Sequence, residues 1–414
     1  MNAALIFGLL IALMLTGMPV SISLGLTVLT YLFTMTTVPI ESVALKLFTG
    51  IENFGIMAIP FFILAGTLLT QGGVARRMIY FATTMVGHLY GGLALAGIIA
   101  CALFAAISGS SVATVAAIGS IILPEMVQRG FPKRFAAGVI TTSGALGILV
   151  PPSIVMVLFA AGIAPGLLLA LALGFTTWLI ARRRRLPRLP RATWLERWRA
   201  LREASWGLAL IVVVIGGIYS GVFTPTEAAA CAAVYSFIVV VFVYGDLKLS
   251  QVPRALLDAA AMSAMLLYII TNAVLFSFLM TSENIPQGMA DWLTSQGLGP
   301  IAFLLVVNVL LLVAGNVMEP SSIVLIMAPI LLPVASRLGI DPVHFGVLMM
   351  VNMEVGLCHP PVGLNLYVAS GITHMGITEL TVAVLPWLLT MLGFLVLVTY
   401  WPALSLVVPQ LLHL

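Results

Sequence analysis

Short groups of small polar residues interrupt otherwise apolar stretches of this chain. In the first half the group offers hydroxyls and backbone oxygens: Ser108, Gly109, Ser110, Ser111 and Thr114. In the second half the group adds an amide and a carboxylate: Asn316, Glu319, Ser321 and Ser322. Hydroxyl and unwound carbonyl oxygens form hard-oxygen cages that suit Na⁺. The predicted chemistry is therefore binding of Na⁺ as a coupling ion, with no resident cofactor.

A Pro-Pro pair follows each polar group, and further polar residues flank it. These are Thr141, Thr142, Ser143 and Gly147 in the first half, and Asn352, Gly356, His359 and Asn365 in the second. Proline lacks an N–H and clashes with the preceding turn, so the helix must break at Pro151-Pro152 and at Pro360-Pro361. Broken backbone persists at membrane depth only where protein buries it or where it lines a cavity. Each polar group and the break that follows it therefore predict one cation site.

The same space could also receive an anion. Half-helix N-termini that face a common space attract a carboxylate. We predict that a carboxylate substrate contacts Ser110, Thr141, Ser143, Asn352 and His359. The alternative is that serine and glycine serve only close helix packing. That alternative explains single residues but not the pairing of a polar group with a break.

Ionisable residues inside apolar stretches are functional candidates because burying them is costly. Glu319 is expected to contact a cation, whereas Glu227, which follows Thr224-Pro225-Thr226, is expected to cap a helix. Glu354 is open between a cation ligand and a structural partner of a buried donor. His359 is expected to form hydrogen bonds rather than carry protons. The first polar group has no carboxylate of its own, so its cation is expected to meet only neutral oxygens and helix-end dipoles.

The two halves are copies of one unit. Ile118 to Ile163 aligns with Met327 to Ile372 without a gap at an offset of 209 residues. Pairs of Gly and Pro coincide in this alignment, among them Gly147 with Gly356 and Pro151 with Pro360. Because Gly and Pro mark backbone breaks, the copies share their interruptions and not only their hydrophobicity.

Composition places the chain among polytopic helical membrane proteins. It has 414 residues, of which 61% are hydrophobic and 8% charged, and apolar stretches recur from end to end. Its three cysteines, Cys101, Cys231 and Cys358, lie in apolar stretches and are expected to be small core residues. We predict an all-α fold with two re-entrant hairpins and two broken helices.

The order of apolar segments divides the chain into five parts. We predict N-terminal scaffold helices and an arm in 1–90, then a first repeat with a hairpin and a broken helix in 91–181. A basic cytoplasmic loop follows in 182–205, and second scaffold helices with an arm in 206–298. The second repeat and a last helix occupy 299–414. The hairpin tips are expected at Ser108–Ser111 and at Gly315–Pro320.

The segment from Arg182 to Arg202 contains nine of the eighteen Lys and Arg residues, so it is predicted to be cytoplasmic. Trp194, Trp198 and Leu201 share one helical face, which indicates contact with the membrane surface; nucleic-acid binding is not expected. Five crossings separate the two hairpins, so they are expected to enter from opposite faces. Such an inverted-topology repeat suits alternating access to a site at the membrane midplane.

Four segments resemble the large membrane subunit of tripartite ATP-independent periplasmic (TRAP) transporters. They are ISGSSVATVAAIG (Ile107 to Gly119), SGALGILVPPSI (Ser143 to Ile154), GVFTPTEAAA (Gly221 to Ala230) and HPPVGLNLYVASGI (His359 to Ile372). The resemblance extends over nearly the whole chain. It implies an elevator-type, Na⁺-coupled importer of an organic acid, such as a C4-dicarboxylate or a sialic acid.

The resemblance also implies partners, a location and ligands. The partners are a small membrane subunit and a periplasmic substrate-binding protein, and the location is a bacterial or archaeal cytoplasmic membrane. By motif, the sodium ligands of the first repeat fall on Ser108, Ser110, Ser111, Gly147 and Pro151. Those of the second repeat fall on Asn316, Glu319, Gly356, Pro360 and Asn365.

The first repeat departs from the family pattern. Two residues separate Gly162 from Pro165, whereas fourteen separate the equivalent Gly371 from Pro386. The missing twelve residues tighten the turn after the first broken helix and put its exit geometry in question. His359 also stands where this family more often has threonine.

Three other functions remain as alternatives. A stand-alone Na⁺/carboxylate symporter of similar architecture would need no partner subunits. A non-transporting membrane scaffold would fit the shortened first repeat. An intramembrane serine protease would need Ser110 or Ser111 within hydrogen-bond reach of a base, for which His359 is the candidate.

Overall fold

The computed structural model describes residues 2–411 except 17, 19, 37–38, 50–51, 53, 151–162, 286–287, 289–290, 292–294, 296–298, 317–319 and 361–362. The described part is helical and contains no strand. Six helices are long and apolar enough to cross a membrane, or seven if the bent pair of α4 and α5 counts as one. The predicted all-α, multi-pass class is therefore confirmed.

The N-terminal half, up to the basic segment, contains ten α-helices within the described residues. They are α1 (Asn2–Leu15), α2 (Val20–Met35), α3 (Ile40–Thr49), α4 (Ala58–Gln71), α5 (Val74–Val86), α6 (Gly92–Ser108), α7 (Ser111–Gln128), α8 (Lys133–Ser143), α9 (Leu146–Leu149) and α10 (Ile163–Arg183). A break at Gly72-Gly73 bends α4 against α5 by 69°. Gly73 has φ +65°, a conformation that glycine adopts without strain.

The second half repeats this sequence of elements. Its helices are α11 (Trp194–Tyr219), α12 (Pro225–Ile238), α13 (Val252–Ser282), α15 (Pro300–Gly315), α16 (Pro320–Arg337), α17 (Pro342–Cys358), α18 (Leu364–Thr373), α19 (Ile377–Tyr400) and α20 (Ala403–Leu411). A π-helical turn, Val239–Val243, follows α12. The predicted cap of α12 is confirmed: the Glu227 N–H donates to Thr224 Oγ1 at 3.3 Å, and the Thr224 N–H donates to Glu227 Oε2 at 2.8 Å.

Helix boundaries follow the 209-residue offset between the two copies in the sequence. Helix α16 begins and ends 209 residues after α7, and α17 spans the interval that α8 and α9 span in the first copy. In each copy two helices form a hairpin, α6 with α7 and α15 with α16, and a third helix returns beside it. Both predicted hairpins are therefore present, although α7 with its 18 residues is longer than expected for a half-span.

The two broken helices become extended at the same register position, 209 residues apart, but the first has an additional turn. In the second copy α17 ends at Cys358, His359 is extended, and α18 begins at Leu364, as the Pro-Pro pair predicts. In the first copy the helix already turns at Gly144 and becomes extended at Val150. Pro151 and the shortened connection after it lie outside the described residues.

The first repeat still meets the last long helix in spite of its shorter connection. The Trp387 indole N–H donates to Thr177 Oγ1 at 2.8 Å, and the Thr176 and Thr390 hydroxyls lie 2.9 Å apart. These bonds join α10 to α19, so the helix that follows the shortening packs beside its symmetry counterpart.

The basic segment is only partly a loop. The loop ends at a capping box formed by Thr193 and Glu196. The rest of the basic segment belongs to α11, which begins at Trp194. The Leu189 N–H donates to the Gly87 carbonyl at 3.0 Å. The Arg188 guanidinium carbon lies 3.1 Å from the centre of the Tyr90 ring. The loop is thus held on the turn between α5 and α6.

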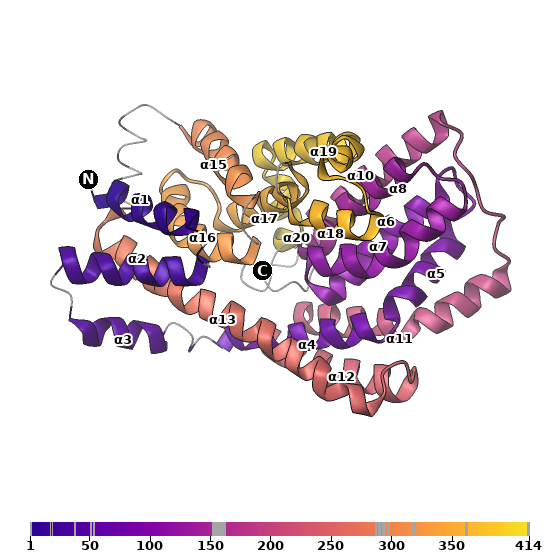
Figure 1. Cartoon of the computed structure of the whole chain (residues 1–414), viewed down its shortest axis with the longest axis horizontal. Coiled ribbons are helices and arrows are strands. Elements are labelled where there is room, and N and C mark those ends of the chain that lie inside the picture. Colours follow the sequence, from indigo (N-terminus) through magenta and orange to yellow (C-terminus); the bar gives the residue numbers. More distant parts are fainter. Residues whose placement is uncertain are drawn as a thin grey trace.

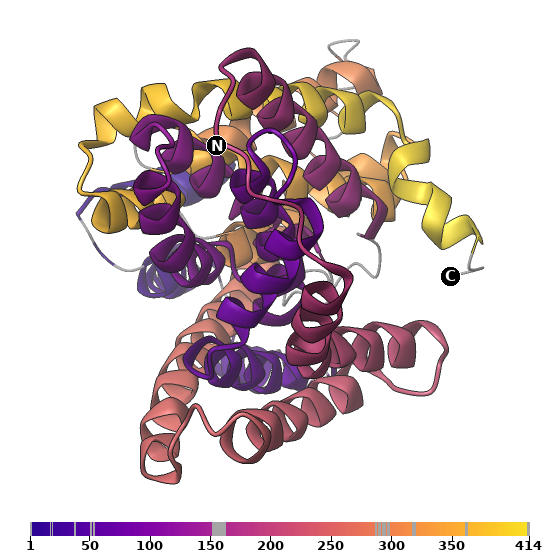
Figure 2. The same ribbon diagram turned by 90° about the vertical axis from the view of Figure 1, so that its right-hand side faces the viewer.

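Two bodies of helices are visible in the views. In Figure 1 the long α13 runs obliquely below the molecule, with α1, α2 and α3 at one end and α12 near the other. Figure 2 shows α4, α11, α12 and α13 together below, while the hairpins, α10 and α19 lie above them. Helix α4 contacts α6 of the first hairpin and thereby links the two bodies.

One helix was not predicted from the sequence. Helix α3 has an acidic residue, Glu41, in its first turn and a basic residue, Lys46, in its last turn. Its ten residues are too few to span a membrane, so a search for apolar stretches of spanning length did not find it.

Candidate functional site

The first hairpin tip closes on Gly109 and Ser110. Gly109 has φ +59°, which reverses the chain after α6, and Ser110 caps α7 by accepting from the Ala113 N–H at 3.4 Å. The Ser108 and Thr114 hydroxyls lie 3.0 Å apart, and Thr114 donates to the Ser110 carbonyl at 2.8 Å. The predicted cluster of oxygens at this tip is therefore present.

This tip touches the break of its own repeat, as predicted. A Cβ atom added at Gly147 would lie 2.7 Å from the carbonyl carbon of Ser110 and would overlap the Ser111 backbone. On the other side, a Cβ at Gly66 in α4 would lie 3.2 Å from Ser108 Cα. Glycine at position 147 thus lets the tip and the break approach each other backbone to backbone.

A carboxylate from the second repeat reaches the first tip. The Ser111 hydroxyl donates to Glu354, with Oγ 2.6 Å from Oε1 and 2.8 Å from Oε2. The backbone N–H of Ile148 in the first break also donates to this carboxylate. Glu354 is fully buried. The expectation that the first tip would have no acidic side chain was therefore wrong, because helix α17 supplies a carboxyl group from the other copy.

Helix α17 divides its side chains between the two repeats. Glu354 and Cys358 are four residues apart and so share one face, which contacts Ser111 and Thr141 of the first repeat. Asn352, Gly356 and His359 share the opposite face, which contacts the second hairpin. The functional residues of the two copies thus meet across this one helix.

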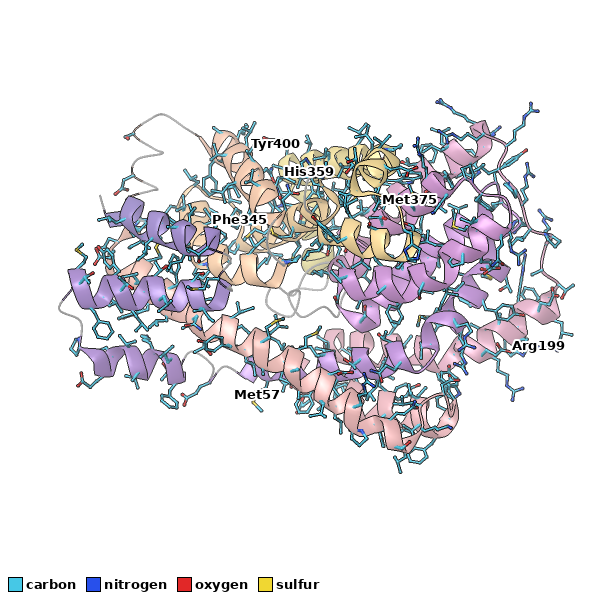
Figure 3. The ribbon with its side chains drawn as sticks, viewed as in Figure 1. Met57, Arg199, Phe345, His359, Met375 and Tyr400 are labelled. Atoms are coloured by element: carbon cyan, nitrogen blue, oxygen red, sulfur yellow. The ribbon has the colours of Figure 1, made fainter. Side chains whose placement is uncertain are left out.

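At the second tip, backbone contact and an amide replace the serines. Gly315 and Gly356 approach so closely that a Cβ at Gly356 would lie 2.9 Å from Gly315 Cα. In the amide orientation that satisfies every partner, Asn316 donates to the carbonyls of His359 at 2.6 Å and Pro360 at 3.3 Å. Its oxygen accepts from His359 Nδ1 at 3.1 Å, so the hydrogen-bonding role predicted for His359 is confirmed. His359 is labelled in Figure 3. Glu319 lies outside the described residues.

A third contact joins the two breaks. The Cys358 thiol lies 3.5 Å from the Thr141 carbonyl and 3.6 Å from Asn365 Nδ2. Asn365 is fully buried and its Oδ1 has no hydrogen-bond partner. The Thr141 and Ser143 hydroxyls donate to carbonyls of their own helix, Ala137 and Val139. Only their lone pairs remain for a ligand.

Asn352 lies away from this centre. Its amide donates to the Asn308 carbonyl at 3.0 Å and to Asn308 Oδ1 at 2.7 Å, and Asn308 in turn donates to Thr399 at 2.9 Å. His344 continues the chain to the Thr399 carbonyl at 3.3 Å. These bonds tie α15, α17 and α19 together through the Asn352 amide nitrogen, while its Oδ1 is buried without a hydrogen-bond partner.

The structure therefore brings most of the predicted cation ligands together in two places. Ser108, Ser110, Ser111 and Gly147 meet at the first, and Asn316, Gly356 and Pro360 at the second. Sequence reasoning did not predict Cys358, Asn308 or the reach of Glu354 into the other repeat. Helical spacing places Glu354 and Cys358 on one face and Asn352 and Gly356 on another, but it does not say which repeat each face meets.

The donor set is oxygen-rich and suits a hard cation. The described part of the chain holds no group of three or more His, Cys, Asp or Glu residues that could bind a metal ion. Softer or transition metals prefer imidazole and thiolate ligands. Backbone carbonyls, hydroxyls and one carboxylate match an alkali ion better.

A comparison with known families decides the class. The profile of the tripartite ATP-independent periplasmic transporter family, DctM component, matches residues 7–404. The chain belongs to this family. It is a multi-pass membrane protein and the large permease component of a TRAP transporter of organic acids, not an enzyme. The protease alternative also finds no support in the site, where Ser111 donates to Glu354 and His359 pairs with Asn316.

Individual relatives carry more specific names. The chain is 70% identical over 438 positions to the C4-dicarboxylate TRAP transporter large permease protein DctM of Rhodobacter capsulatus, covering 100% of both chains. It is 52% identical over 400 positions to the protein of the same name from Pseudomonas aeruginosa, covering 94% of each. Because the first alignment has 438 positions and this TRAP permease has 414 residues, at least 24 positions have no residue here.

The fold is also similar to a solved transporter. The YdaH transporter of Alcanivorax borkumensis superposes with a TM-score of 0.64 at 18% identity, over 91% of this chain and 90% of that one. At this identity the likeness concerns the fold alone.

Proposed function

We propose that this permease imports a C4-dicarboxylate across a bacterial cytoplasmic membrane, coupled to Na⁺. A small membrane subunit and a periplasmic binding protein complete the transporter. The observation that carries the coupling is the buried carboxylate of Glu354 at the first hairpin tip. The substrate class is supported by the 70% and 52% identical relatives, both of which are named for C4-dicarboxylates.

The argument for a cation starts from the cost of a buried charge. An uncompensated carboxylate in a low-dielectric interior is strongly destabilising, so it needs a counter-charge or a proton. No basic side chain of the described residues forms an ion pair with Glu354. Its partner Ser111 belongs to the first tip, which also contains the oxygens of Ser108 and Ser110 and touches the first break at Gly147. A Na⁺ ion bound among them would supply the missing positive charge.

Two helix N-termini support a proposed position for the substrate. Helix α7 begins at Ser111 and α18 begins at Leu364, and helix N-termini favour anionic groups. One carboxylate of a dicarboxylate would be held near the first tip and the other near the second break, with Ser110 and His359 as contacts. Binding of Na⁺ would offset the repulsion between Glu354 and the anionic substrate, which explains why ion and substrate would move together.

The repeat suggests how the site is exposed to each side in turn. Two copies that enter the membrane from opposite faces place their tips near the midplane, and rocking or sliding of this unit alternates access. The helices α11, α12 and α13 would form the static part, and the hairpins with α8, α17 and α19 the moving part. This elevator arrangement is part of the proposal.

The stand-alone symporter and the scaffold remain the competing functions. The scaffold has one specific observation in its favour, the absence of at least 24 positions of the R. capsulatus relative, together with the shortened first repeat. A transport assay separates all three functions.

The assay uses proteoliposomes that contain the permease and its small subunit, with radiolabelled succinate outside. We expect uptake only when the binding protein and an inward Na⁺ gradient are both present, and loss of uptake when choline replaces Na⁺. Undiminished uptake in choline would refute the sodium coupling. Uptake without the binding protein would support the symporter, and no uptake with every component present would support the scaffold. Excess sialic acid should not compete with succinate.

A further inference from the structure

A cavity of about 480 Å³ lies between α8, α10 and α19, and no tip or break residue lines it. Three arginines line it: Arg134, Arg183 and Arg184. The remaining lining is apolar and aromatic: Phe135, Ile180, Val382, Ala383, Pro386 and Trp387. Figure 1 shows α8 and α10 side by side at the upper right, with α19 beside them. The cavity therefore combines concentrated positive charge with hydrophobic walls.

The charge in this cavity is mostly unbalanced. Arg134 forms an ion pair with Glu379 at 2.8 Å. Arg183 and Arg184 form no ion pair with any described residue. Other arginines of the basic segment are engaged elsewhere, since Arg182 lies over Trp178 at 5.1 Å and Arg188 over Tyr90. Two guanidinium groups at the cavity are thus left for an anionic ligand.

The walls of the cavity are closely packed and continue into an outward-facing apolar surface. Phe135 and Trp387 are buried and stack edge to face at 5.4 Å, and close contact at Gly138 holds α8 against α19. Val382 at the edge of the cavity is exposed, and Leu385 and Leu389 extend the exposed apolar face along α19. A ligand with a charged end and a long apolar part would match this path.

We propose that this cavity binds the headgroup of an anionic glycerophospholipid, whose acyl chains follow the outward face of α19. Arg183 and Arg184 pair with the phosphate, which guanidinium groups bind in a bidentate manner. Basic pockets between membrane helices are suited to anionic lipid headgroups. Pro386 has no N–H to donate to the Val382 carbonyl, so this carbonyl can accept from a headgroup hydroxyl. The lipid would tie the shortened first repeat, through α10, to the second.

The test is native mass spectrometry of the delipidated, detergent-purified chain titrated with phosphatidylglycerol or phosphatidylcholine. We expect phosphatidylglycerol to bind at least tenfold more tightly. The double variant Arg183→Gln/Arg184→Gln should weaken its binding by roughly 30-fold. This factor corresponds to about 1 kcal/mol of binding free energy for each of the two arginines. The matched control Arg185→Gln/Arg191→Gln also removes two positive charges, but from residues outside the cavity. It should change binding less than threefold.

Three results would overturn the proposal. Equal loss in the control pair would show general surface electrostatics. Displacement of phosphatidylglycerol by inorganic phosphate or succinate at millimolar concentration would show a small-anion site instead of a lipid site. Equal binding of the two lipids by the unaltered chain would show no headgroup recognition. If the glutamine pair does not fold, Val382→Trp fills the lipid-facing edge without changing charge and should weaken phosphatidylglycerol binding, and unchanged binding in that variant would also refute the proposal.

Discussion

Glu354 accepts a hydrogen bond from Ser111, a residue 243 positions earlier in the chain and in the other repeat. This bond makes the two copies interdependent, because the tip of the first copy cannot be complete without helix α17 of the second. Its counterpart position in the first copy, Ala145, has no side chain that could return the contact. The repeat is therefore symmetric in its backbone and asymmetric in its charge.

The first prediction concerns this carboxylate. Glu354→Gln removes the charge at nearly constant shape, so the sodium concentration for half-maximal uptake should rise by roughly tenfold to hundredfold, which is the ~1.5–3 kcal/mol of an interaction with a charged group. Ser111→Ala should have a smaller effect, since the carboxylate remains. Uptake rate against sodium concentration, normalised to protein in the membrane, measures both.

A matched control is Glu227→Gln, which makes the same chemical change in an exposed capping box. It should leave the sodium curve unchanged. If Glu354→Gln also left the sodium curve unchanged and only lowered the amount of folded protein, Glu354 would be a structural partner of Ser111 and the proposed cation site would be lost.

The sequence predicted the backbone of the site better than its side-chain contacts. Gly and Pro constrain the main chain locally, so Gly147, Gly356 and the Pro-Pro pair at Pro360 were sufficient to predict tips, breaks and their pairing. The structure confirms the closeness of Gly147 to Ser111 and of Gly356 to Gly315.

The positions of Gly and Pro did not predict the side-chain contacts between the two repeats. Whether Glu354 faces its own hairpin or the other one depends on how two helices pack, and this packing has no signature in the sequence around residue 354. Asn352 shows the same limit, since its place before a break did not predict the hydrogen bond from its amide nitrogen to Asn308 in an adjacent helix.

The second prediction uses the glycine contacts. Gly356→Ala would place a methyl group against the Gly315 backbone, which cannot move as a side chain can, so overpacking should cost about 1–3 kcal/mol or more and reduce transport. The control is Gly393→Ala in α19, where an added Cβ meets nothing within 4 Å. That change should be neutral or stabilising by about 0.5–1 kcal/mol. Thermal unfolding in detergent distinguishes the two, and similar unfolding temperatures would contradict the close contact.

The third prediction separates structure from substrate binding at Asn352. Asn352→Ala leaves Asn308 without its donor inside the protein, so it should lower stability by about 1–3 kcal/mol. The sodium dependence and the KM for succinate should stay within twofold. A normal unfolding temperature combined with a strongly raised KM would instead restore the substrate contact expected from the sequence.

The fourth prediction tests the orientation of the chain in the membrane. The basic segment is expected on the cytoplasmic side because it concentrates the arginines. Arg191 is exposed and forms no ion pair with a described residue, whereas Arg188 covers the Tyr90 ring and is a poorer probe. Cys101 and Cys358 are buried, so only the half-exposed Cys231 needs replacement by alanine. In that background, Arg191→Cys should react with a membrane-impermeant maleimide in inside-out vesicles and stay unlabelled in right-side-out vesicles. The reverse pattern would place the basic segment outside, together with Arg183 and Arg184 of the proposed lipid cavity.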